Sequence, residues 1–308
     1  MSSKTKIEAQ PNKFQLLLAR IKVAWRHFCK FVRKKFRQFC QFIRFRVLGQ
    51  RECMAVRHDF CASKKPKVTV LFIHGIAASY ESWREAVAML ENDVDTKDIR
   101  FVAIDLMGFG HSPRPKDFKY TYAGYREALR YTIKKLHINT PLILAGHSMG
   151  CLISMDYALA HPKDVAKMVL VSPPIFRKAE IGSITDKLYH VTYSKISEIT
   201  DKELIDKMGN LINFISGFDQ KTLESPAFHG GIENIILNND NYKRFFSLRK
   251  PIKVIHGRFD PFISGENLRA IAARNKSIDL ITTNGKHSID GTKRDRIVKI
   301  IKEECLNI

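Results

Sequence analysis

The 308-residue chain is poor in the features that mark disulfide-rich, metal-binding or membrane-spanning proteins. Its eleven histidines form no His-x-x-x-His or His-x-Glu pattern, so we predict no metal, and nothing suggests a cofactor. No stretch approaches the ~18 uncharged residues that a membrane-spanning helix needs, and no apolar block precedes a small-residue cleavage site. The six cysteines show no close pairing, which predicts free thiols in a reducing compartment: Cys29, Cys40, Cys53, Cys61, Cys151 and Cys305.

Acidic residues are almost missing from residues 1–51. This segment holds fourteen Lys or Arg residues and a single acid, Glu8, so it carries thirteen of the twenty-one net positive charges. The remaining residues carry 38 basic and 30 acidic groups and have the mixed apolar and charged composition of a globular protein. The chain therefore has a moderately basic domain and a very basic head.

The basic head also carries a regular apolar stripe. The apolar residues recur every three or four positions, which predicts an amphipathic helix with Lys and Arg on its other face. They are Phe14, Leu18, Ile21, Trp25, Phe28, Val32, Phe36, Phe39, Ile43 and Val47. Such a helix would be ~50 Å long at 1.5 Å per residue, too long to pack entirely on one domain. We therefore expect residues 14–48 to bind an anionic membrane surface, with the protein on the cytoplasmic, inner face of a membrane.

Three other roles for the head remain open. The helix could cover an apolar patch of its own domain or of a second copy, and the sequence leaves the oligomeric state undetermined. It could be an organellar presequence, which is also rich in Arg and poor in acids. It could bind nucleic acid through phosphate contacts, although that role leaves the continuous apolar stripe without a function.

Residues 52–308 alternate strand-like and helix-like segments. Buried-strand patterns follow a lead-in at 54–61 and occupy 68–73, 101–104, 142–145, 168–171, 252–255 and 278–282. Helical patterns occupy 83–90, 122–136, 151–160, 265–273 and 293–304. Strands apolar on both faces that alternate with helices predict an α/β protein with a doubly wound, mostly parallel sheet. Functional residues should then lie at the carboxyl ends of the strands.

One gap in the alternation predicts an inserted helical cap. We place the cap at 176–246, between core segments 52–175 and 247–308. Within it, Leu204, Met208, Leu211 and Ile215 form a helical stripe, and Gly230-Gly231 predicts a break between elements. The cap is rich in apolar side chains that suit an acyl chain, or that could equally form its own core: Leu188, Tyr189, Tyr193, Ile212, Phe214, Phe218 and Phe228.

The most informative motif is Gly146-His147-Ser148-Met149-Gly150, which joins a predicted strand to a predicted helix. A serine between two glycines at such a junction is typical of a nucleophile elbow, because glycine lets strand and helix approach closely. The hydroxyl then points toward the free N–H groups of the helix, which favour developing negative charge. The five-residue pattern is weak by itself, and its place between strand and helix makes it informative.

A serine nucleophile needs an imidazole that takes its proton and a carboxylate that orients the imidazole. The strand ends offer Asp260, in Gly257-Arg258-Phe259-Asp260-Pro261, and His287, in Gly285-Lys286-His287. His74, His147 and His256 lie beside glycines at other strand ends, where a structural role is the simpler interpretation. The chain order of the candidates is therefore Ser, Asp, His.

Residues 54–308 closely resemble the α/β-hydrolase superfamily, in its serine-nucleophile, esterase- and lipase-like branch with a helical cap. The resemblance is carried by His74-Gly75, the loop from Asp105 to Ser112, the elbow and the two segments with Asp260 and His287, which follow the family's order and separations. It implies that Ser148 is the nucleophile, His287 the general base and Asp260 its orienting carboxylate. It further implies an oxyanion hole of the Ile76 and Met149 backbone N–H groups, and a pocket shaped by His74, Gly75, His147 and Phe109. The short stretch before His74 leaves the family's first two strands uncertain.

The resemblance implies an acyl-enzyme intermediate but leaves the reaction open. With a membrane-binding head, a lipophilic carboxylic ester is the favoured substrate. The alternatives are hydrolysis of a carbon–carbon bond, amide cleavage, acyl or peroxide transfer, and a catalytically silent binding protein with the same fold.

Overall fold

The computed structural model describes Trp25, Val32 and residues 52–177, 220–238 and 240–308. The chain divides into two compact units, 1–51 and 52–308. Trp25 and Val32 are helical and exposed, and the rest of the predicted basic helix lies outside the described residues. The same holds for the predicted stripe from Leu204 to Ile215 and for most of the predicted cap. None of the helices in the described parts is both long enough and apolar enough to span a membrane.

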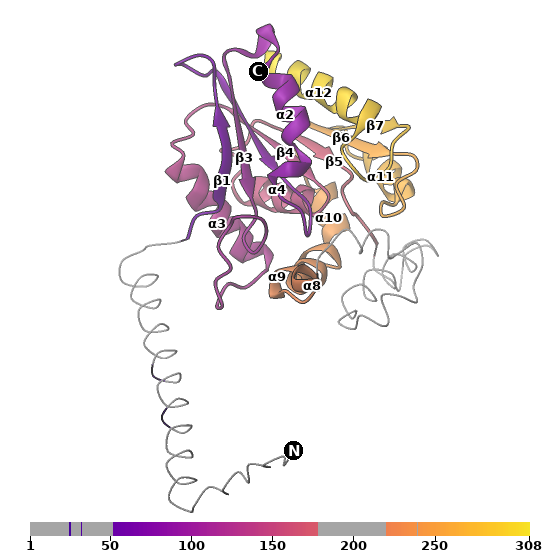
Figure 1. Ribbon diagram of the computed structural model, residues 1–308. Coiled ribbons are helices and arrows are strands. Elements are labelled where there is room, and N and C mark those ends of the chain that lie inside the picture. The colour runs from indigo at the N-terminus through magenta and orange to yellow at the C-terminus, as the bar shows by residue number, and fades with distance from the viewer. Residues whose placement is uncertain (1–24, 26–31, 33–51, 178–219, 239) are drawn as a thin grey trace, which may run out of the picture. The chain divides into compact units, whose positions relative to one another are not determined.

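A seven-stranded sheet forms the centre of residues 52–308 (Figure 1). Its strands lie in the order β1-β3-β2-β4-β5-β6-β7. They are β1 (Ala55–Phe60), β2 (Val68–Ile73), β3 (Ile99–Asp105), β4 (Leu142–His147), β5 (Lys167–Val171), β6 (Ile252–Gly257) and β7 (Ile278–Thr283). All neighbours pair in parallel except β1, which pairs antiparallel with β3. The predicted doubly wound, mostly parallel sheet is confirmed. The sequence left the strands before His74 uncertain, and in the described part of the chain one strand, β1, precedes β2.

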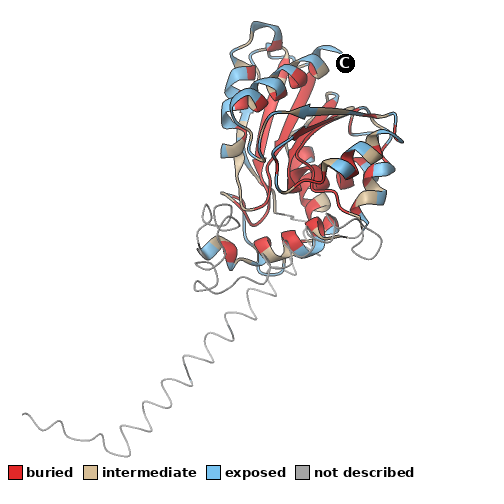
Figure 2. Ribbon diagram, turned by 90° about the vertical axis from the view of Figure 1, so that its right-hand side faces the viewer, coloured by how far each residue is buried: buried red, intermediate tan, exposed pale blue. Residues whose placement is uncertain are grey.

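Helices cover both faces of the sheet. On one face lie α2 (Arg84–Glu91) and α12 (Gly291–Leu306), in a core shared with side chains of β2 to β6. On the other face lie α3 (Tyr122–Lys135), α4 (Met149–Ala160), α10 (Asn241–Phe246) and α11 (Gly265–Ala272). The central strands are red in Figure 2 because almost every residue of β2, β4 and β5 is buried. Alternate side chains of each strand therefore enter two separate cores.

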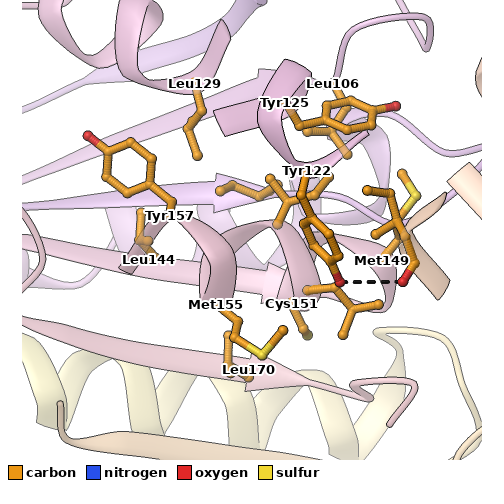
Figure 3. Packing of buried hydrophobic residues seen from close by; sticks show 14 of the residues in the cluster. Leu106, Tyr122, Tyr125, Leu129, Leu144, Met149, Cys151, Met155, Tyr157 and Leu170 are labelled. Carbon is orange, nitrogen blue, oxygen red and sulfur yellow. Dashed lines mark hydrogen bonds between the residues drawn. The ribbon is translucent and has the colours of Figure 1, made fainter. Parts of the chain in front are cut away.

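The larger core joins α3 and α4 to the sheet (Figure 3). Tyr122, Tyr125 and Leu129 of α3 meet Met149 and Met155 of α4, and all are buried. The Tyr125 hydroxyl donates to the Met107 carbonyl oxygen at 3.2 Å, which satisfies the polar end of a fully buried ring. This core supports the turn from β4 into α4.

The described end of the predicted cap is helical. It contains α8 (Gln220–Leu223), α9 (Pro226–Gly230), the π-helix η4 (Gly231–Ile236) and α10. An element boundary does fall at Gly230-Gly231, where α9 ends and η4 begins, but the backbone stays helical across it. A Cβ on Gly230 would lie 2.6 Å from Tyr120 Cβ, and one on Gly231 would lie 3.0 Å from Met149 Sδ. These glycines therefore permit close packing on the core and do not mark a turn.

Candidate active site

Ser148 occupies a strained turn between β4 and α4. Its φ of 53° and ψ of −121° lie in a backbone region that residues other than glycine rarely adopt. The glycines on either side explain how the turn is held. A Cβ on Gly150 would lie 2.4 Å from the Ile73 carbonyl oxygen, and one on Gly146 would lie 2.8 Å from the Cys151 nitrogen. Only glycine fits at either position, so strand, serine and helix meet in one tight turn.

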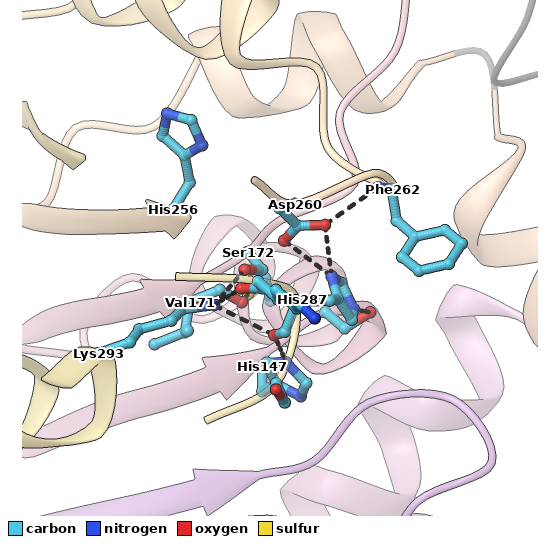
Figure 4. A network of polar contacts seen from close by, with 12 residues as sticks. His147, Val171, Ser172, His256, Asp260, Phe262, His287 and Lys293 are labelled. Carbon is cyan, nitrogen blue, oxygen red and sulfur yellow. Dashed lines mark hydrogen bonds and ion pairs between the residues drawn. The ribbon is translucent and has the colours of Figure 1, made fainter. Parts of the chain in front are cut away.

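The structure brings Ser148, His287 and Asp260 together from three separate loops. Figure 4 shows His287 beside Asp260. His287 follows β7, and Asp260 follows the neighbouring β6. His287 Nε2 lies 3.0 Å from Ser148 Oγ, and His287 Nδ1 lies 3.0 and 2.9 Å from the two oxygens of Asp260. With the proton on Nδ1, the imidazole donates to Asp260 and accepts from the serine hydroxyl, which suits proton removal from Ser148.

Asp260 is held in its ionised form. Burial raises the pKa of its carboxyl, but the hydrogen bond from His287 and the backbone N–H of Phe262 outweigh burial, and the pKa falls below its usual value. The Phe262 N–H donates to Asp260 Oδ1 at 3.0 Å, and the Phe262 ring packs edge-on against His287 at 5.4 Å between centroids. The carboxylate can therefore fix both the tautomer and the orientation of the imidazole.

Two backbone N–H groups near Ser148 lack a partner within the part of the chain that the structure describes. Among the described residues, the N–H groups of Ile76 and Met149 donate no hydrogen bond. Met149 is the first residue of α4, and Gly75 packs so tightly on the elbow that a Cβ there would lie 2.9 Å from Ser148 Cβ. This contact keeps the loop with Ile76 beside the serine, where its N–H can face an oxygen bonded to the attacked carbon.

The residues expected to shape a pocket lie in different places. A cavity of about 760 Å³ opens above Ser148, and Gly75 and His147 line it. His74 lies below the cavity and is fully buried; its Nδ1–H donates to the Gly75 carbonyl oxygen, and its Nε2 accepts the Leu106 N–H at 2.8 Å. Phe109 packs edge-on against His74 and lines a separate cavity of about 160 Å³.

The large cavity has both apolar and charged walls. Its apolar lining includes Ile76, Phe259, Pro261, Phe262 and Ile289, and Phe259 is 63% exposed. Five charged side chains also line it: Glu81, Arg84, Glu85, Lys286 and Asp290. Phe228 of the predicted cap is only 1% exposed and belongs to the protein core, so it does not contribute to this cavity.

Three buried histidines near the site are held neutral. Burial lowers the pKa of His74 to about 4, and burial together with the charge of His287 lowers that of His147 to about 3. Burial also lowers the pKa of His256. His147 Nε2 lies 3.0 Å from the carbonyl oxygen of His287 and donates to it. These histidines shape the loops and are poor proton carriers at neutral pH.

Sequence reasoning missed two polar residues of this network, Ser172 and Lys293. Ser172 follows β5 with a φ of 53°, and Lys293 lies in the first turn of α12, and both are buried. One signal was available for Lys293, because it shares the spacing of the buried residues Ile297, Ile300 and Ile301 on one helix face. Within the described residues, no cluster of three or more metal-binding side chains occurs.

Comparison with known proteins adds the following findings. Residues 68–195 match the family model described as alpha/beta hydrolase fold. Over 125 residues the chain is 34% identical to the "Probable lysophospholipase BODYGUARD 4" of Arabidopsis thaliana, a match that covers 41% of this chain and 29% of that protein. The chain thus spans less than a third of the length of the Arabidopsis relatives that it matches.

Solved structures share the architecture. An esterase from Exiguobacterium antarcticum superposes with a TM-score of 0.62 at 18% identity, over 81% of this chain and 94% of that chain. A thermophilic esterase from Thermogutta terrifontis superposes with a TM-score of 0.62 at 17% identity, over 82% and 93%. At such identities the likeness concerns the fold.

Proposed function

The chain belongs to the α/β-hydrolase superfamily, and on this basis we propose that it hydrolyses a lipophilic carboxylic ester through an acyl-enzyme intermediate. The observation that carries the proposal is that His287 contacts both Ser148 and Asp260. The distances from its two ring nitrogens to Ser148 Oγ and to Asp260 Oδ2 are within hydrogen-bonding range. The likeness to esterases and to a protein named a probable lysophospholipase supports the ester substrate.

The proposed reaction has two halves. Ser148 Oγ attacks the ester carbonyl carbon while His287 Nε2 takes the hydroxyl proton, and the negative oxygen is stabilised by the N–H groups of Ile76 and Met149. His287 then gives its proton to the leaving alkoxide, which departs as the alcohol. A water molecule, deprotonated by His287, attacks the acyl-enzyme and releases the carboxylic acid, and the proton returns to Ser148.

The cavity lining favours an apolar substrate group. Ile76, Phe262 and Ile289 offer apolar surface next to Ser148 and His287. Burying each methylene of an acyl chain contributes ~0.8 kcal/mol, so a few methylenes change binding measurably. We further propose that residues 14–48 hold the protein on an anionic membrane surface, where lipophilic esters are concentrated.

The test is turnover of p-nitrophenyl esters of increasing acyl length. We expect kcat/KM to rise from acetyl to medium-length chains, and Ser148→Ala to lower kcat by roughly 10⁴-fold or more. Ser154→Ala is the matched control, because its buried hydroxyl donates to the Gly150 carbonyl oxygen within the same helix and does not face the cavity. Equal activity of wild type and Ser148→Ala would refute the proposal.

A further inference from the structure

A buried lysine lies directly behind the candidate catalytic histidine. Lys293 is 1% exposed, and its ammonium donates three hydrogen bonds, one for each proton. The acceptors are Ser172 Oγ at 2.9 Å, the Lys286 carbonyl oxygen at 2.7 Å and the His287 carbonyl oxygen at 3.1 Å. Two of these bonds hold consecutive residues of the loop that carries His287 (Figure 4).

The cost of burying this charge argues for a specific role. A buried ammonium loses several kcal/mol of hydration, and an apolar side chain of similar size would avoid that loss. Within the described residues Lys293 forms no ion pair, so hydrogen bonds and more distant charges compensate it. Burial lowers the pKa of Lys293 to about 8, and the charge of Asp260 is the largest effect that opposes this.

Ser172 connects the lysine to Asp260. Its hydroxyl oxygen accepts from Lys293, and the nearby hydroxyl is also one of the causes of the lowered pKa of Asp260. The backbone of Ser172 is fixed as well, since its N–H donates to the Ile255 carbonyl oxygen at 2.8 Å. Ser172 thus links the ammonium of Lys293 to the surroundings of the Asp260 carboxylate, which in turn bonds the imidazole.

The fit around the lysine stem is tight. A Cβ on Gly285 would lie 2.9 Å from Lys293 Cδ, so the loop before His287 packs directly on the aliphatic part of the side chain. The carbonyl oxygen of His287 also accepts from His147, which gives this one oxygen two donors from different elements. The backbone of His287 is therefore held from both sides.

We propose that Lys293 is a positioning residue that fixes the His287 loop and, through Ser172, orients the Asp260 carboxylate with a buried positive charge. The proposal rests on the function proposed above, because it assigns a role to Lys293 in activating Ser148.

The pH dependence involves every titratable group around the ammonium. Loss of a buried positive charge favours protonation of the groups around it, so the rise of activity with pH should move to higher pH in a variant that lacks the ammonium. The neighbouring groups are Asp260, His287, His147, His256, Cys151 and Asp290. His147 and Cys151 stay neutral in this range, because burial lowers the pKa of the first and raises that of the second.

The test is the rate at which a fluorophosphonate labels Ser148 between pH 5 and 9. For Lys293→Met, which keeps the length of the stem, we expect at least tenfold slower labelling and a pH midpoint higher by roughly half to one unit. For Ser172→Ala, which keeps the ammonium, we expect labelling to slow severalfold with the midpoint unchanged. Lys167→Met is the matched control, since its ammonium bonds the Glu304 and Asn307 carbonyl oxygens at the opposite end of the sheet.

The outcomes separate the two proposals. If wild type is labelled and Lys293→Met, folded by circular dichroism, is labelled at the same rate with the same pH midpoint, the role of Lys293 is refuted. If Lys293→Met does not fold, Ser172→Ala decides, and an unchanged rate in that variant refutes the path to Asp260. If folded wild type is not labelled, the proposed hydrolase function itself fails.

Discussion

Single residues at the elbow are constrained by the backbone that surrounds them. Ser148 has a positive φ, Gly146 and Gly150 leave no room for a Cβ, and Gly75 packs on Ser148 itself. These are steric requirements of one turn and do not depend on the substrate. They explain why a five-residue motif could locate the serine from the sequence.

We predict that Gly150→Ala destabilises the elbow. Its Cβ would lie 2.4 and 2.5 Å from the carbonyl oxygens of Ile73 and His74, so the backbone of β2 or α4 must shift, at a cost of roughly 2–3 kcal/mol. Urea denaturation measures the loss of stability. In the control Gly291→Ala the new Cβ meets no atom within 4 Å, and the positive φ of 47° alone should cost about 1 kcal/mol. An equal loss in both variants would contradict the steric argument.

Buried histidines make stability depend on pH. Because the folded-state pKa values of His74 and His147, about 4 and about 3, lie below the usual 6.5, the unfolded chain binds protons that the native state does not. The stabilisation is complete above pH 6.5 and is lost as the pH falls. We expect the free energy of unfolding to drop by roughly 2 kcal/mol per histidine between pH 6.5 and 5.

Urea denaturation at both pH values measures this drop. His74→Gln should remove its own share of roughly 2 kcal/mol, and His111→Gln should leave the drop unchanged, because the His111 side chain is 68% exposed. A drop of the same size in wild type and His74→Gln would show that other groups cause the pH dependence.

At the level of helices and strands, one buried carboxylate joins three helices. Asp156 of α4 accepts from Arg126 of α3 at 2.8 Å and from Arg244 of α10 at 2.6 Å. The guanidinium of Arg244 also lies over the Tyr122 ring, at 4.5 Å from its centroid. The last helix of the predicted cap is thereby fixed to the core that supports Ser148.

We predict that Asp156→Asn lowers the free energy of unfolding by roughly 2–3 kcal/mol, because two cations lose their charged acceptor. The control is Asp279→Asn, which breaks the Lys253–Asp279 pair at a carboxylate that is 58% exposed and should cost less than about 0.5 kcal/mol. The two variants are compared by urea denaturation, and equal costs would show that Asp156 acts only as a surface charge.

Sequence patterns located most elements but not their arrangement. The run at 68–73 correctly predicts β2, because five of its six residues are apolar, and all six are buried in the structure. The predicted end of β4 at Ala145 is short by two residues, since Gly146 and His147 still pair with Leu170 and Val171. The antiparallel direction of β1 and the strand order depend on pairing between distant segments, which no local pattern encodes.

The same distinction between local patterns and long-range packing applies to the residues of the candidate site. Ser148, Asp260 and His287 follow strands, so their proximity could be predicted from the parallel sheet and the family's motif order. Lys293 and Ser172 carry no motif, and a lysine in a helical pattern is normally assigned to the solvent-facing side. Their contact depends on the packing of the first turn of α12 behind β5, which becomes visible only in three dimensions.

At the scale of the whole molecule, the uneven distribution of charge leads us to expect membrane binding. Residues 1–51 carry a net charge of +13, and residues 52–308 carry the remaining +8. We predict that deletion of residues 1–51 abolishes binding to vesicles that contain anionic lipid and leaves turnover of a soluble ester intact. A vesicle sedimentation assay together with p-nitrophenyl ester kinetics measures both properties.

A matched full-length variant separates charge from apolar contact. Replacing Arg33, Lys34 and Lys35 by Glu keeps the apolar stripe and should weaken binding to anionic vesicles by about tenfold or more, since each basic residue contributes up to about 1 kcal/mol. Vesicles of neutral lipid serve as the reference. Unchanged vesicle binding after deletion of 1–51, or unfolding of the remaining protein, would contradict the anchor.

The most direct measurement of the central claim is fluorophosphonate labelling of the full-length protein followed by peptide mapping. The proposed mechanism predicts one phosphonylated residue, Ser148, with no adduct in Ser148→Ala and normal labelling in Ser154→Ala. A folded wild-type protein that gains no adduct, or that is modified at another serine while Ser148 stays free, would contradict the assignment of Ser148 as an activated nucleophile.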